Sequence, residues 1–220
     1  MNKQYISLEQ TGQGYRGRMS VRSRYMKVKR LMDIGLSLAA AVVLAPVYIG
    51  LAVAIRLDSP GPVLFRQKRV GIHKKYFYIL KFRTMRIDTP KDVPTHMLKN
   101  PEQYITGMGR FLRKTSLDEL PQIFNILKGD MSLIGPRPAL WNQDDLIAAR
   151  DRYGANDIMP GLTGWAQING RDELPIAVKA KLDGEYARKM SFLFDLRCFF
   201  GTIRSVLTSD GVKEGGTGKD

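Results

Sequence analysis

Asp118 and Glu119 are adjacent carboxylates in the stretch Ser116–Asn125, SLDELPQIFN, between an arginine-rich segment and an apolar run. A carboxylate is a weak nucleophile, but it can form an acyl-phosphate intermediate, act as a base or bind a hard metal ion. A structural role is also open, since Ser116 and Glu119 fit a capping box. With Asp118 as the cap instead, Pro121 falls at the third helical position, where its missing N–H costs no helical bond. The pair alone therefore leaves helix capping and catalysis open.

Basic side chains around this pair favour chemistry on phosphate. Arginine forks match phosphate oxygens, and their charge stabilises a transferring phosphoryl group. Four short segments supply such cations: KFRTM with Lys81 and Arg83, RFLRK with Arg113, GPRPAL with Arg137, and GWAQINGRDE with Arg171. Each cation alone is typical of a solvated surface. Four clusters with one acidic pair, on a chain that also has a long apolar segment, predict a phosphate-rich substrate and a lipid.

Histidine and cysteine are too scarce for a soft metal site. His73 and His96 lie far apart in the chain, and Cys198 is the only cysteine. A zinc site is therefore not expected, and any metal should be a hard ion bound by carboxylates and phosphate. The single cysteine also excludes an intrachain disulfide framework and favours a reducing compartment.

The formal net charge of +14 belongs to the N-terminal part of the chain. Residues 1–87 carry 17 Lys or Arg against three acidic residues, whereas residues 88–220 carry 18 of each. A basic tract suits nucleic acid or an anionic membrane surface. A membrane-anchored basic protein that binds nucleic acid or lipid without catalysis is the alternative function, with these aromatic residues for stacking: Tyr76, Phe77, Tyr78 and Phe82. It does not account for the acidic pair or the neutral C-terminal part, so no nucleic acid is expected as a partner.

The apolar segment Ile34–Ile55 favours the membrane. It runs for 22 residues without a charge, and a straight helix of that length would span about 33 Å, close to the hydrocarbon thickness. Basic residues flank it on both sides, and such residues mark the cytoplasmic side. Pro46, near the middle, removes one helix hydrogen bond and favours a kink. A re-entrant helix that enters the cytoplasmic leaflet, bends at Pro46 and returns meets both conditions. A straight span and a buried helix of a soluble core are the alternatives.

The chain as a whole is expected to be α+β and mostly helical. Its expected parts are a basic flexible tail (1–26), the re-entrant membrane helix (27–57), a compact cytoplasmic catalytic domain (58–208) and a flexible C-terminal tail (209–220). Short strands are predicted at 63–67 and 76–82, with a surface loop at 88–105. Helical patterns follow near 107–114, 118–128, 141–153, 174–190 and 193–208. The last of these is amphipathic enough for a core helix or for one lying on a membrane surface.

Several motifs, in order, resemble the monotopic phosphoglycosyl transferases, a family of bacterial sugar transferases. They are KRLMDIGLSL, SPGPVLFRQKRVG, KFRTM, RKTSLDELPQIFNILKGDMSLIGPRP and PGLTGWAQINGR, and the likeness covers about residues 27–208. The resemblance implies transfer of a sugar-1-phosphate from a UDP-sugar to polyprenyl (undecaprenyl) phosphate, with release of UMP. It further implies Mg²⁺, an aspartyl-phosphosugar intermediate, and a monotopic position on the cytoplasmic face of the bacterial inner membrane. The product would start a membrane-associated glycan such as an exopolysaccharide, capsule, O-antigen or glycoprotein glycan.

The resemblance also implies a role for individual residues. Asp118 matches the family's nucleophile, and Glu119 matches its partner near the metal. Seven residues are expected to hold the substrate phosphates or the nucleotide. Five of them are cations: Lys81, Arg83, Arg113, Arg137 and Arg171. The other two, Asp183 and Tyr186, match a family Asp-x-x-Tyr motif near the active site. A sequential route, in which Asp118 acts only as a base, also fits the sequence.

The chain departs from the family pattern in two places. The membrane break, commonly Ser–Pro, reads Ala45–Pro46, and the segment after Asn-Gly-Arg lacks a tryptophan that many small members carry. The second difference leaves the sugar open. Membrane lipids are expected partners, and a homodimer is one candidate assembly.

Overall fold

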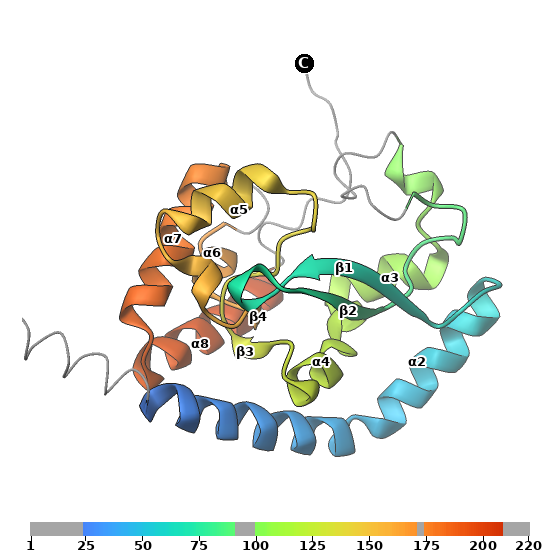
Figure 1. The fold of residues 1–220 in the computed structure, drawn as a ribbon. Coiled ribbons are helices and arrows are strands. Elements are labelled where there is room, and N and C mark those ends of the chain that lie inside the picture. The colour runs from blue at the N-terminus through green and yellow to red at the C-terminus, as the bar shows by residue number, and fades with distance from the viewer. Residues whose placement is uncertain (1–23, 91–99, 171–173, 209–220) are drawn as a thin grey trace, which may run out of the picture.

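The computed structural model describes residues 24–90, 100–170 and 174–208, and the fold is α+β and mostly helical, as the sequence predicts (Figure 1). The helices are Arg24–Val43, α2 (Ala45–Asp58), α3 (Gly107–Thr115), α4 (Gln122–Lys128), α5 (Asp144–Asp151), α6 (Trp165–Ile168), α7 (Ile176–Lys189) and α8 (Phe192–Thr208). The strands are β1 (Leu64–Val70), β2 (Tyr76–Phe82), β3 (Ser132–Ile134) and β4 (Gly161–Thr163). Single 3₁₀ turns are η1 (Ile72–Lys74), η3 (Pro101–Gln103), η4 (Leu117–Glu119) and η5 (Ala155–Asp157).

Helix Arg24–Val43, here called the N-terminal helix, and α2 form a bent pair along one side of the molecule (Figure 1). Their axes differ by 62°, with the break at Leu44. Pro46 lies in the first turn of α2, where it has no N–H to donate back into the N-terminal helix. A bend is thus present next to the proline that predicts it. The other labelled elements lie on one side of this pair in Figure 1.

The N-terminal helix turns polar side chains toward the protein and apolar ones outward. Lys29, Asp33 and Ser37 repeat every four residues and are buried. The exposed apolar side chains include Leu31, Leu36, Val42 and Val43. A surface helix of a soluble domain has the opposite arrangement, with its apolar stripe on the core. Among the described residues no helix by itself has the length and apolarity to cross a membrane, whereas the bent pair taken together meets both criteria.

The β1–β2 hairpin lies near the middle of the molecule in Figure 1. The two strands pair antiparallel from Leu64 opposite Phe82 to Val70 opposite Tyr76. The predicted strand 76–82 is therefore confirmed, while the predicted strand 63–67 continues to Val70 because the pairing does. Phe77 and Ile79 pack against Ile126 of α4 and against Met131. Because side chains alternate along a strand, Lys81 points to the same face, toward the start of α4.

Two glycine-containing motifs meet at the parallel pair β3–β4. A Cβ on Gly164 would lie 2.0 Å from the carbonyl oxygen of Gly135, and one on Gly161 would lie 2.1 Å from the Gly135 nitrogen. Only glycine allows such an approach of two backbones. The GPRPAL and PGLTGWAQINGR segments therefore lie side by side, which the sequence does not predict.

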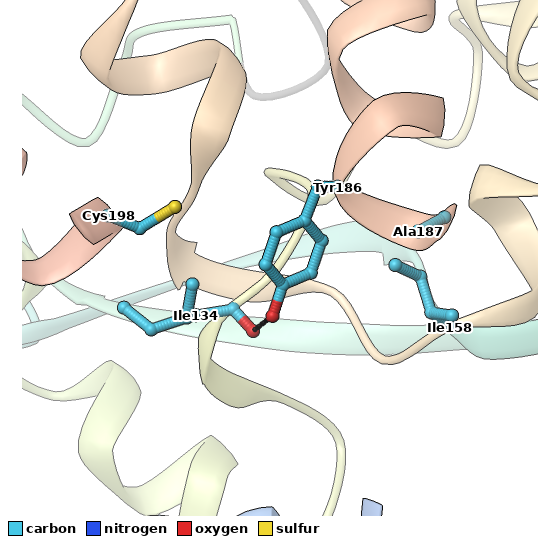
Figure 2. Packing of buried hydrophobic residues seen from close by; sticks show 5 residues of the cluster. All are labelled: Ile134, Ile158, Tyr186, Ala187 and Cys198. Atoms are coloured by element: carbon cyan, nitrogen blue, oxygen red, sulfur yellow. Dashed lines mark hydrogen bonds between the residues drawn. The ribbon is translucent and has the colours of Figure 1, made fainter. Parts of the chain in front are cut away.

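A hydrophobic cluster joins β3, α7 and α8. Figure 2 shows its five buried residues, Ile134, Ile158, Tyr186, Ala187 and Cys198, with the Tyr186 hydroxyl at the Ile134 carbonyl. The helical patterns predicted near 107–114, 141–153, 174–190 and 193–208 agree with α3, α5, α7 and α8 to within three residues. The pattern at 118–128 divides into the 3₁₀ turn η4 and α4, because the chain turns before Pro121.

Candidate active site

Asp118 and Glu119 lie in the 3₁₀ turn η4, which connects α3 to α4. Helix α3 begins where the Thr106 side chain accepts a hydrogen bond from the Gly109 N–H, and it ends at Ser116, whose backbone is left-handed with φ 57°. Within the described residues, Ser116 makes no side-chain cap, and the residue before α4 is Pro121. The capping-box interpretation of the acidic pair is therefore wrong in this structure. The turn leaves both carboxylates for other contacts.

Lys81 and Arg137 bring two positive charges to the pair. Lys81 Nζ, near the end of β2, lies 2.7 Å from Glu119 Oε1 and 3.7 Å from Asp118 Oδ2. The Arg137 guanidinium donates to Glu119 Oε1 at 2.6 Å and to Oε2 at 3.3 Å. Four sequence-predicted site residues thus meet in one place, although three separate segments supply them. Charge-assisted bonds of this length are the strong ones.

The two adjacent carboxyls have opposite pKa shifts. Burial raises the pKa of Asp118 above its usual range; Lys81 opposes this shift, and the neighbouring Glu119 charge adds to it. Burial would also raise the pKa of Glu119, but Arg137 and Lys81 outweigh it and hold that pKa well below its usual range. Glu119 is therefore the fixed anion that pairs with the cations. Asp118 is the carboxyl with fewer strong partners among the described residues, its ion pair with Lys81 being the longer one at 3.7 Å.

Arg113 reaches the region from α3 and is oriented by Thr84. Its Nε donates to Thr84 Oγ1 at 3.0 Å, and its charge lowers the pKa of Asp118. Thr84 follows β2 in the KFRTM segment, and its carbonyl lies so close to Gly109 that a Cβ there would be 2.0 Å away. This close approach of α3 to residue 84 fixes the direction of the Arg113 side chain. Thr84 orients the Arg113 side chain, a contact that the sequence does not predict.

Arg83 is placed elsewhere, which corrects the expectation that it binds substrate phosphate. Its side chain is buried and donates from Nη2 to the Ser59 carbonyl at 2.7 Å and from Nη1 to the Pro60 carbonyl. The strand ends at Phe82, so the alternation that points Lys81 to the site does not continue. Arg83 thus fastens the turn after α2.

Asp183 also lies away from the pair, in the core between α5 and α7. Its carboxylate accepts from Arg150 Nε at 2.8 Å and lies 2.6 Å from Arg150 Nη2. The same Nη2 donates to the carbonyl of Arg137 at 3.0 Å. Asp183, expected to contact substrate, instead supports the backbone that carries Arg137. Arg150 is a residue that the sequence analysis missed.

Tyr186 is likewise a core residue rather than a substrate contact. It is 1% exposed, and its hydroxyl contacts the Ile134 carbonyl at 3.1 Å, the interaction drawn in Figure 2. The same hydroxyl lies 2.7 Å from Asp195 Oδ1. Burial raises its pKa, and the Asp195 carboxylate raises it further. Tyr186 therefore stays neutral and structural. Arg171, the remaining sequence-predicted phosphate ligand, lies outside the described residues.

Asn125 connects α4 to β2 and was also missed. Its Oδ1 accepts from the Leu80 N–H at 2.9 Å, and its Nδ2 donates to the Tyr78 carbonyl at 2.8 Å. The side chain thus pairs with the edge of β2 as another strand would, one residue before Lys81. A buried Asn on the apolar face of 121–127 was the signal in the sequence, because buried amides need such partners.

A hard divalent cation fits the pair only together with substrate. Among the described residues, no group of three or more Asp, Glu, His or Cys side chains could hold a metal. Mg²⁺, however, commonly uses one or two carboxylates plus substrate phosphates. Lys81 and Arg137 both contact Glu119 Oε1, whereas Oε2 has a longer contact with Arg137, at 3.3 Å. Asp118 and Glu119 therefore provide a suitable oxygen pair for such an ion.

Two carboxyls with opposed pKa shifts lie beside a lysine and an arginine, an arrangement that suits chemistry on a phosphate group. Comparison with known proteins gives the family. The family described as "Bacterial sugar transferase" matches residues 24–209. The chain belongs to the bacterial sugar transferase family.

Individual relatives show how far the similarity extends. The chain is 39% identical over 189 residues to "Uncharacterized sugar transferase EpsL" of Bacillus subtilis, covering 86% of this chain and 92% of that protein. It is 40% identical over 194 residues to "Undecaprenyl-phosphate glucose phosphotransferase" of Komagataeibacter xylinus, covering 84% of this chain and 36% of that protein. It is 40% identical over 183 residues to "UDP-glucose:undecaprenyl-phosphate glucose-1-phosphate transferase" of Escherichia coli, covering 80% of this chain and 39% of that protein. The chain thus spans little more than a third of the last two relatives.

Proposed function

We propose that this protein transfers a sugar-1-phosphate from a UDP-sugar to polyprenyl phosphate, with release of UMP. The observation that carries the proposal is the Asp118–Glu119 pair, in which Lys81 and Arg137 neutralise one carboxylate and leave the other available. The names of the relatives, two of which specify undecaprenyl phosphate and glucose, supply the substrate class. The sugar itself stays open. The lipid-linked product would be the first unit of a glycan such as an exopolysaccharide.

In the proposed first step, an Asp118 carboxylate oxygen attacks the phosphorus that carries the sugar. A P–O bond to Asp118 forms, and the anhydride bond to the other phosphorus breaks, so that UMP leaves with that electron pair. In the second step, an oxygen of polyprenyl phosphate attacks the same phosphorus and regenerates the Asp118 carboxylate. The carboxylate must be ionised to attack, and the surrounding cations offset its repulsion from the diphosphate.

The cations and the metal have separate proposed tasks. Arg137 and Lys81 hold Glu119 in place, and Arg113 is directed at the reacting phosphate by Thr84. Mg²⁺, if held by Glu119 and Asp118 with the substrate phosphates, would neutralise charge that develops on the leaving group. Two of the four aromatic residues of the nucleic-acid alternative, Phe77 and Phe82, are buried, which weakens that alternative.

The function is tested by UMP release from purified protein in detergent. We expect release from at least one UDP-sugar when undecaprenyl phosphate and Mg²⁺ are both present, together with formation of a lipid-linked diphosphosugar. EDTA should abolish the reaction, and added Mg²⁺ should restore it. No release from a broad panel of UDP-sugars would refute the proposed function. Full activity in EDTA would refute the metal role given to Glu119.

We also propose that the bent helix pair is re-entrant and that the protein sits on the cytoplasmic face of the bacterial inner membrane. The N-terminal helix supports this position, because its exposed face is apolar and its buried face is polar. Both ends of the pair also contact the same globular part: Tyr25 donates to Asp195, and Asp58 accepts from the Met108 N–H. A straight span would separate these two ends by the membrane thickness.

Cysteine labelling tests this topology. Cysteines introduced at Lys27 and at the exposed His73 should both resist a membrane-impermeant maleimide in intact cells and react after lysis. The native Cys198 is buried, so it should contribute little background in folded protein. Labelling of position 27 alone from outside would show a spanning helix. Pro46→Leu should push part of the population toward that spanning orientation, because it restores the missing helix hydrogen bond.

A further inference from the structure

Helix α4, which follows directly after Asp118–Glu119, is bonded near both ends by the bent helix pair. On the N-terminal helix, Arg30 donates from Nη1 to the Ile126 carbonyl at 2.6 Å and from Nη2 to the Leu127 carbonyl at 3.1 Å. On α2, the Tyr48 hydroxyl donates to the Leu120 carbonyl at 2.7 Å. The two donors belong to different arms of the pair, with the bend at Leu44 between them.

The Arg30 contact suits the C-terminal end of a helix. The last carbonyls of a helix have no intrahelical donors, and they carry the negative end of the helix dipole. The Arg30 guanidinium contacts two of these carbonyls at once and offsets the partial charge, although the Ile126 carbonyl also accepts the Gly129 N–H at 3.1 Å. Because α4 has only seven residues, its own hydrogen bonds give it little independent stability. An external donor at this end therefore matters more than it would for a long helix.

The Tyr48 contact lies at the other end, next to the acidic pair. Leu120 directly follows Glu119, and its carbonyl also accepts the Ile123 N–H at 3.1 Å in the first turn of α4. The Tyr48 ring packs between Phe82 and Phe124, with ring centroids 5.8 Å and 5.7 Å away. The ring is thus held in place by both β2 and α4. Its hydroxyl fixes the peptide unit that follows η4, the turn that carries Asp118 and Glu119.

We infer that Tyr48 and Arg30 are positioning residues for Asp118 and Glu119, and that the bent helix pair clamps α4 at both ends. Since both donors belong to the pair proposed to lie in lipid, its seating in the membrane is coupled to the geometry of the site. The inference rests on the proposed function, because positioning has a catalytic consequence only if the pair reacts. The clamp itself is measurable without turnover.

The test uses full-length protein in nanodiscs of phosphatidylethanolamine and phosphatidylglycerol. Tyr48→Phe removes only the hydroxyl, and Arg30→Met removes the guanidinium while keeping a long side chain. Each change should speed hydrogen exchange of the 117–128 segment by about fivefold or more, because it removes a bond that closes one end of α4. Each should lower kcat about tenfold, with KM for the UDP-sugar within about twofold, since a small misplacement of reacting groups is costly.

Matched controls separate the clamp from a general loss of stability. Tyr76→Phe removes a hydroxyl from an exposed ring, and Arg56→Met removes a guanidinium that donates to the Gly61 carbonyl, away from α4. Neither should change exchange in 117–128. Arg30→Lys keeps a cation at the end of α4 and should recover part of the protection. Exchange in α7 should stay unchanged in all these variants.

The outcomes are distinct. Unchanged exchange in 117–128 for Tyr48→Phe and Arg30→Met would overturn the clamp. Faster exchange in 117–128 with kcat unchanged would overturn the positioning role. A loss of kcat without faster exchange would mean that these residues act in some other way, and it would also overturn the inference. A wild-type protein without turnover would refute the proposed function, while the exchange data would still decide the clamp.

Discussion

Asp118→Asn is expected to lower the rate of sugar-phosphate transfer by at least about 10³-fold and to leave the fold intact. Asn has almost the same shape as Asp, but it lacks the negative oxygen that attacks phosphorus. Asn caps helices as well as Asp does, so a capping role would make the change nearly silent. The rate of UMP release measures the effect. Asp88→Asn, which alters an exposed carboxylate paired with Arg86, is the control and should keep full activity.

Stability should move in the opposite direction from activity. Burial raises the pKa of Asp118 in the folded protein, so the neutral carboxyl is favoured by folding and the ionised one is not. The stabilisation is present below the unfolded pKa and is lost as the pH rises through the folded pKa. Above the folded pKa the wild-type protein lacks it, whereas the amide introduced by Asp118→Asn is neutral at every pH. The unfolding temperature of this variant should therefore equal or exceed that of the wild type.

Trapping distinguishes a nucleophile from a base. Wild-type protein incubated with the UDP-sugar and without a lipid acceptor should gain the mass of one phosphosugar, on the peptide that contains Asp118. A sequential reaction with Asp118 as base would give no adduct although the complete reaction proceeds. An adduct on another residue, or an active Asp118→Asn protein, would show that the nucleophile was assigned wrongly.

The sequence predicts this site better than it predicts the support around it. The second hairpin strand follows from its aromatic and β-branched residues, and the period of two places Lys81 on the face that meets α4. The same reasoning fails for Arg83, because β2 ends at Phe82 and the chain then turns toward Ser59. Periodicity holds only inside an element. The exact end of an element is what a single sequence determines least.

Asp183 shows a second limit. Asp183 was expected to meet substrate because it matches a family Asp-x-x-Tyr motif. Its helical neighbours Ala180, Gly184 and Ala187 are small and buried, and they show that this face of α7 is packed. An acid on such a face needs a buried partner, here Arg150. That partner is 33 residues away in the chain, and no local pattern connects the two.

The inward polar face of the N-terminal helix could have been found from spacing. Lys29, Asp33 and Ser37 recur at intervals of four, beside an apolar segment that predicts a membrane helix. Polar residues on one face of such a helix indicate contact with protein rather than lipid. The partners of Lys29 and Asp33 are Asp195 and Ser132, which are again distant in sequence. The sequence indicates that this face contacts other parts of the protein, but it does not indicate which segment it contacts.

Glu119→Gln and Lys81→Met are expected to shift the acid limb of the profile of kcat/KM against pH in opposite directions. The attacking Asp118 must be ionised, so activity rises as the pH passes upward through its raised pKa. Glu119 raises that pKa through its negative charge, and Lys81 lowers it through its positive charge. Glu119→Gln should therefore move the limb to lower pH, and Lys81→Met should move it to higher pH. The opposite signs of the two shifts are the prediction, because the two removed charges act on the Asp118 pKa in opposite directions.

Both changes should also lower the maximal rate, by about 10²- to 10³-fold, because each removes a fixed charge from the site. Glu119→Gln leaves Lys81 and Arg137 without their shared anion, and Lys81→Met leaves Asp118 without its largest opposing cation. The profile of kcat/KM against pH, measured on the residual activity, separates the two effects: the rate reports the loss of charge, and the limb reports the pKa of Asp118. Arg86→Met, which removes an exposed cation paired with Asp88, should change neither. Shifts of the same sign in both variants would mean that the limb belongs to another group, and Asp118 would then not be the residue whose ionisation controls the reaction.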